Sequence, residues 1–280
     1  MGGSADPSAP HEYTLTPQIL SKGTYDNSTL PDLQLIENAM YRITLEGTDL
    51  AGNTGKKFIM SIVYDDVAPK LGIKYPEPNT VVNNLNFAYF LSEQLGKGQF
   101  IYTQIGGEQD PNSPVVLSLS ESELEKMIDV PRLPTNPPVL NDGSIYNIKF
   151  VGEDLATNKT ESDVVENVRY DITRPKISIS YPSGNTFFLG TEIGMEVSED
   201  LLEAVLIWTR TGGLPDDGSP HRMPLSDVLL KKGTYQDAPF PINESLNTSA
   251  IYTLSVEGKD FADNDVCLLY TSDAADDTDS

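Results

Sequence analysis

The chain has 280 residues, with 42 acidic and 19 basic side chains, and so carries a formal net charge of −23. A field of this sign repels phosphate, which argues against nucleic acid and anionic membranes as partners. One cysteine and two histidines exclude a disulfide framework and a multi-thiolate metal site, and they leave little for zinc or for a Ser-His-Asp triad. The sequence contains no apolar run of about 18 residues, so we expect no membrane insertion within it.

The sequence repeats itself with a period of about 105 residues. Ser92-Glu93 returns as Ser198-Glu199 with an offset of 106. The clearest block leads from a tyrosine to an Asp-x-Ala-x-Asn motif, and its spacings are 105 and 106 residues for the copies that begin at Tyr41, Tyr146 and Tyr252. Independent blocks with one offset are the signature of a repeat architecture.

The register of the repeat divides the chain into four regions. Residues 1–68 correspond to the C-terminal half of one unit, and residues 69–174 form a complete unit. Residues 175–265 form a third unit, which we expect to lack its last strand. Residues 266–280 match no part of the repeat, and we expect them to be a non-native or disordered tail.

The apolar residues of each unit alternate with polar ones in short runs, as at Tyr146, Ile148 and Phe150. This period of two predicts half-buried strands, and 20 prolines and 21 glycines supply turns and strand edges between them. Seven or so short strands in about 105 residues fit a β-sandwich of the immunoglobulin (Ig) type. The seams at 64–69 and 170–175 are short and end in proline. We therefore predict an all-β chain of tandem Ig-like β-sandwich domains joined by semi-rigid seams.

Several motifs resemble those of tandem bacterial Ig-like repeats over roughly residues 1–265. They are the Asp-x-Ala-Gly-Asn element, the Tyr-Asp-x-x-x-Pro seam, the Ser-Glu-Asp-Leu run at 198–201 and the Trp-Thr-Arg-Thr-Gly-Gly block at 208–213. Cadherin and fibronectin type III repeats are more distantly similar. The resemblance implies non-catalytic structural or adhesive spacer modules of a large extracellular or cell-surface protein. Their partner would be a protein or a glycan that the sequence does not identify.

The alternative is an accessory or carbohydrate-binding module of a secreted enzyme that acts on polysaccharides. We expect no catalytic residue within this chain, because no Asp/Glu pair stands out as a general acid and base. Glu93, Glu199, His11 and His221 recur between units and are interpreted as parts of the module's frame.

Acidic residues at the seams form the strongest candidate for a ligand-binding site in the sequence. Calcium takes about six to eight oxygen ligands, which carboxylates from a seam and an adjacent loop can supply. The resemblance to cadherin, whose seams bind calcium between domains, adds to this prediction. The candidate ligands are Glu46, Asp49, Asp65, Asp66, Glu153, Asp154 and Asp171.

Two structural interpretations compete with ligand binding. Asp49, Asp154 and Asp260 each precede the motif's Ala-x-Asn, where an aspartate makes Asx-type hydrogen bonds to the backbone of a tight turn. The repeated tyrosines could stack on sugars. Their place at a strand start favours a tyrosine corner instead, in which the hydroxyl bonds upstream backbone.

Overall fold

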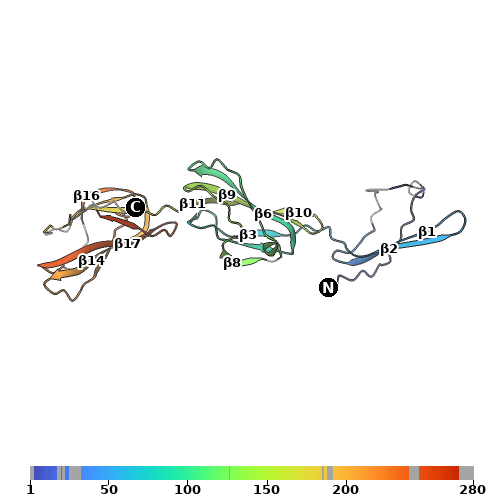
Figure 1. Ribbon diagram of the computed structural model, residues 1–280, viewed down its shortest axis with the longest axis horizontal. Helices are drawn as coiled ribbons and strands as arrows, with labels where there is room; N and C mark the ends of the chain where they lie inside the picture. Colours follow the sequence, from blue (N-terminus) through green and yellow to red (C-terminus); the bar gives the residue numbers. More distant parts are fainter. Residues whose placement is uncertain are drawn as a thin grey trace, which may run out of the picture.

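The computed structural model describes residues 3–17, 20, 23–24, 33–125, 127–184, 186–187, 192–239 and 246–270. Strands dominate these residues, and the described helix is a single turn, α1 (Glu121–Leu124), so the all-β prediction is confirmed. The strands are grouped in three bodies that follow one another along the longest axis of the molecule (Figure 1).

The first body is a hairpin of two antiparallel strands, β1 (Met40–Thr48) and β2 (Thr54–Val63). The turn between them is the first copy of the Asp-x-Ala-x-Asn motif. Residues 3–11 lie beside the start of β1, since the Ser4 amide donates a hydrogen bond to the Asn38 carbonyl over 2.9 Å.

The second body has two sheets. One has the order β3 (Leu71–Tyr75), β5 (Phe87–Leu91) and β8 (Ile128–Arg132). The other has the order β4 (Val81–Val82), β11 (Val165–Tyr170), β9 (Ser144–Asp154), β6 (Leu95–Gly107) and β7 (Val115–Ser118), and β10 (Lys159–Glu161) also pairs with β9. The β6–β9 pair carries the longest register in this body.

Aromatic side chains from both sheets fill the core of the second body. Phe100 on β6 and Phe150 on β9 stack with their ring centroids 4.5 Å apart, and Tyr89 on β5 meets Phe150 edge-on at 5.3 Å. All three are at most 1% exposed. The predicted alternation is confirmed in β9, where every second side chain from Ser144 to Phe150 is buried. The two sheets therefore pack face to face as a sandwich.

The third body repeats this arrangement around a separate core. One sheet has the order β16 (Gly233–Pro239), β13 (Glu192–Val197), β12 (Lys176–Tyr181) and β18 (Cys267–Tyr270). The other has the order β15 (His221–Pro224), β14 (Leu201–Gly213) and β17 (Ala250–Asp260). Its core includes Ile177, Met195, Leu206 and Trp208.

Strand β18 differs from the sequence-based expectation that the third unit lacks its last strand. Lys176 to Ile179 of β12 pair in parallel with Cys267 to Tyr270. The edge of β12 offers unpaired backbone groups, and an extended segment of any sequence can satisfy them. Residues 271–280, the rest of the expected tail, lie outside the described residues.

The three repeated tyrosines form the predicted tyrosine corners. The hydroxyl of Tyr146 accepts a hydrogen bond from the Asn141 amide over 3.0 Å and donates one to Asp110 over 2.6 Å. The same pair of bonds ties Tyr41 to Ile36 and Asp6, and Tyr252 to Asn247 and Asp216. These tyrosines fix the loop before the strand, and Tyr146 is 1% exposed.

Candidate metal centre

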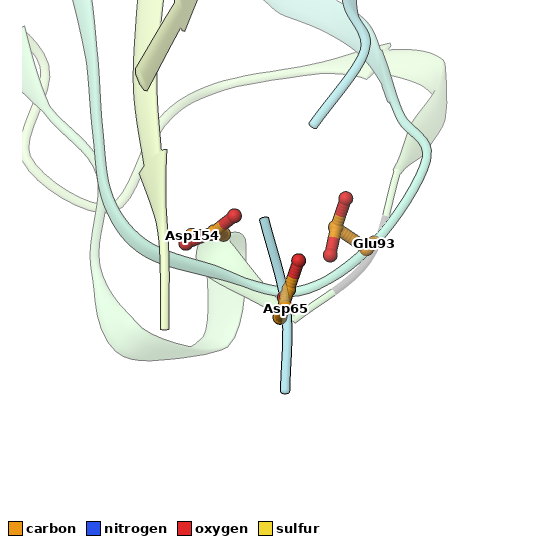
Figure 2. Close-up of side chains that lie close together, drawn as sticks. All are labelled: Asp65, Glu93 and Asp154. Atoms are coloured by element: carbon orange, nitrogen blue, oxygen red, sulfur yellow. The ribbon is translucent and has the colours of Figure 1, made fainter. Parts of the chain in front are cut away.

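Each seam carries a cluster of three carboxylates. One oxygen from each of Asp65, Glu93 and Asp154 lies within 4.8 Å of the other two, and the side chains converge on a common space (Figure 2). The second cluster obeys the same limit and consists of Asp171, Glu199 and Asp260. Every member of the first cluster is separated by 106 residues from its counterpart in the second. The site is therefore part of the repeat.

Each cluster joins two neighbouring units. Asp65 belongs to the seam between β2 and β3, whereas Glu93 and Asp154 belong to the unit that follows it. The side-chain amide of Asn158, four residues after Asp154, donates hydrogen bonds to the Asp65 carbonyl over 3.2 Å and to its carboxylate over 3.4 Å. At the second seam, Asn264 donates to the Asp171 carbonyl over 2.9 Å. The asparagine of the repeated motif thus holds the seam against the next unit.

The motif's aspartate makes the predicted turn and also faces the cluster. Asp154 Oδ1 accepts hydrogen bonds from the amides of Ala156 and Asn158 over 2.8 and 2.9 Å, and Oδ2 accepts one from the Asn158 side chain over 2.9 Å. Asp260 and Asp49 accept the same three kinds of bond. An ionised carboxylate has about four acceptor positions, so the turn does not use up the capacity of Asp154. The two interpretations of this aspartate are compatible.

The sequence-based set of candidate ligands lacks the glutamate of each cluster, and it lacks Asp260, which was interpreted as a turn residue alone. A hydrogen-bonded loop holds Glu93, because the Lys70 amide donates to Ser92 Oγ over 2.8 Å and the Ser92 amide donates to the Lys70 carbonyl over 3.0 Å. The same two bonds join Lys176 and Ser198 beside Glu199. The shared offset of Ser92-Glu93 was visible in the sequence, but it was interpreted as frame alone.

Carboxylates at this spacing repel one another. Burial, followed by the charges of Asp65 and Asp154, raises the pKa of Glu93. Burial, followed by the charges of Asp171 and Asp260, likewise raises the pKa of Glu199. A bound cation would relieve this repulsion, because an opposite charge nearby favours the ionised carboxylate.

Of the seven predicted ligands, the structure brings together Asp65 with Asp154 at the first seam and places Asp171 at the second. The other four lie outside the clusters. Glu46 pairs with Lys56, Asp49 belongs to a turn of the first unit, Asp66 accepts from Tyr64, and Glu153 pairs with Lys97 and Lys159. Glu153 adjoins Asp154 on β9, where successive side chains point to opposite faces.

The donor set of each cluster fits calcium. Calcium prefers oxygen ligands at about 2.3–2.6 Å, so two oxygens on one ion lie at most about 5 Å apart. Carboxylate oxygens within 4.8 Å of one another satisfy this limit. Within the part of the chain that the structure describes, neither cluster includes a histidine or cysteine, so the donors are hard oxygens and suit calcium better than zinc.

Comparisons with known proteins add no family to this picture: neither the models of protein families nor the curated proteins give a match to the chain. Among the described residues, no helix has the length and apolar character required to cross a membrane. The functional argument therefore rests on the geometry of the seams.

Proposed function

We propose that this chain is a run of Ig-like spacer modules of an extracellular or cell-surface protein, and that calcium at the seams sets the geometry between modules. The supporting observation is that each cluster combines one carboxylate from a seam with two from the next unit. An ion bound there would tie consecutive units together. It would also reduce the bending freedom of a seam that already contains proline.

The arrangement of the units supports the proposed spacer role. They succeed one another along a line, and the second and third have separate cores. A linear array of this kind separates the segments at its two ends, and calcium at the seams would control the stiffness of the array. The large acidic excess keeps an extended array soluble.

Isothermal titration calorimetry of the full chain tests the calcium site. We expect about two calcium ions per chain, with dissociation constants of about 0.1–1 mM, the range of extracellular calcium modules. Magnesium should bind more weakly, because it requires a tighter octahedron of ligands. The thermal unfolding midpoint should rise in millimolar calcium, since a ligand that binds the folded state stabilises it. Absence of both binding heat and a rise in the midpoint would remove the metal from the proposal.

A further inference from the structure

The first unit exposes side chains that the other units bury. Ile43 and Leu45 on β1 are 52% and 55% exposed. Their equivalents 105 residues later, Ile148 and Phe150 on β9, are 1% and 0% exposed. The same apolar pattern therefore lies open in one unit and forms the core of another.

The buried copies show which strand covers these positions. In the second unit, Phe150 pairs with Phe100 and Ile148 pairs with Tyr102 across the β6–β9 ladder. Tyr89 on β5 packs on Phe150 from the facing sheet. In the third unit, β14 pairs with β17 in the corresponding register, with Leu206 opposite Val256 and Trp208 opposite Leu254. The second and third units thus cover these positions with the same kind of strand pairing.

Within the described residues, β1 pairs along its length with β2 alone. Beside its start, Ser4 bridges Ala39 in the stretch that follows Gly3. In the second unit, Gly107 ends β6 and pairs with Ser144, the equivalent of Ala39. Ser4 therefore lies beside β1 at the position equivalent to the end of β6 on β9. Among the described residues, no strand pairs with the rest of this edge of β1.

We propose that the open face of β1 and β2 accepts a segment equivalent to residues 69–105, with its β6-like strand paired to β1 in the register of β6 on β9. The face on which Ile43 and Leu45 lie also includes Ile59 of β2, which lies opposite Ile43 in the ladder and is 59% exposed. Large exposed apolar patches mark interaction sites. The occupant would cover Ile43 and Leu45 with aromatic side chains, as Phe100 and Tyr102 cover their equivalents.

The test joins a copy of residues 69–105 to Gly2 in the full chain and follows amide hydrogen exchange of β1. We expect the amides of Thr44 and Glu46, which point away from β2, to exchange about 100-fold more slowly than in the unextended chain, because pairing with the grafted strand protects them. A second graft of residues 175–211 should give the same protection. The matched control carries Phe100→Asp and Tyr102→Asp in the grafted copy only, and it should give none.

Two outcomes would overturn this proposal. One is unchanged exchange of β1 with both grafts. The other is a dimer of the unextended chain, seen by light scattering, that protects β1 and persists in the grafted proteins, since the occupant would then be a second copy. Neither outcome bears on calcium binding at the seams.

Discussion

The two seams share three carboxylates but differ in the charges around them. At the second seam Arg169 lies beside Asp171, with Nε 3.5 Å from Oδ2. The equivalent position at the first seam, 106 residues earlier, is Val63. The first seam also carries Asp66 where the second has Ile172. The repeat thus preserves the three carboxylate positions and varies the charges around them. The electrostatic potential should be more negative at the first seam, which should therefore attract a cation more strongly.

The hydrogen bonds across the seam, in contrast, are stronger at the second seam than at the first. Asn264 is buried, donates to the Asp171 carbonyl over 2.9 Å, and accepts from Asn83 of the preceding unit over 3.3 Å. Asn158 at the first seam is less buried, and its bonds to Asp65 are 3.2 and 3.4 Å long. The second seam is therefore better fixed by protein groups alone, and we expect the first to depend more on an added cation.

The largest expected effect is the loss of one calcium site at a time. Glu93→Gln should remove binding at the first seam, and Glu199→Gln should remove it at the second, because each variant deletes one of three ligand charges. Calorimetry should then give about one ion per chain in place of two. Glu153→Gln is the matched control, since Glu153 lies next to Asp154 in sequence but pairs with lysines. Equal loss in the control would show that only bulk charge matters.

The asparagine contacts should give the next largest effect. Asn264→Ala removes a buried donor to the Asp171 carbonyl and to Asp260, which should lower the free energy of unfolding of the third unit by about 1–3 kcal/mol. Asn158→Ala should cost the second unit about 1 kcal/mol. Denaturant unfolding measures both. Asn53→Ala is the control, because Asn53 makes the turn bond to Asp49 within a unit. If Asn264→Ala costs no more than this control, the seam bond contributes nothing.

Exchanging the residue beside the seam should bring the two affinities closer. Arg169→Val should tighten calcium binding at the second seam by about 3- to 5-fold, and Val63→Arg should weaken it at the first by a similar factor. These factors correspond to the roughly 1 kcal/mol expected for a partly exposed ion pair. Titrations in the Glu93→Gln and Glu199→Gln backgrounds isolate each seam. Unchanged affinities would show that Arg169 leaves the cluster when calcium binds.

The smallest effect concerns pH without calcium. The pKa values of Glu93 and Glu199 are raised in the folded chain by burial and by neighbouring carboxylates, so the folded state holds protons that the unfolded state releases. The stability from these groups is present at low pH and falls as the pH rises above about 4.3 through the raised pKa. Glu199→Gln should therefore raise the unfolding midpoint by about 1–2 °C at pH 7 and leave it unchanged near pH 4. A lower midpoint at pH 7 would contradict this assignment.

The sequence was sufficient to predict those features that depend on local pattern. Alternation predicts β9, the Asp-x-Ala-x-Asn motif predicts the turn at Asp154, and the recurring tyrosine predicts the corner at Tyr146. Each needs only residues within about a dozen positions of one another. Pairings such as β4 with β11, or β18 with β12, join distant segments through backbone hydrogen bonds, and no side-chain pattern predicts them.

The ligand set was predicted in part, for an identifiable physical reason. Closeness in sequence suggested Glu153 and Asp66, but alternation along a strand separates neighbours, and a loop near Lys70 brings Glu93 from 61 residues before Asp154. Recurrence of Glu93 at Glu199 indicates a role in the module's frame, because residues present in neighbouring units are most simply explained by the fold that the units share. A repeated residue can also serve the junction between repeats, and only the three-dimensional placement distinguishes the two cases.

The central claim is that calcium fixes the geometry between units. Double electron–electron resonance, which measures distances between two spin labels, tests it most directly. Spin labels at Val116→Cys and Val228→Cys, with Cys267→Ser, occupy exposed positions on either side of the second seam. We predict that the distribution of distances between the labels narrows in millimolar calcium and stays broad in the Glu199→Gln variant. A distribution of equal width with and without calcium, in a chain shown by calorimetry to bind it, would contradict the account.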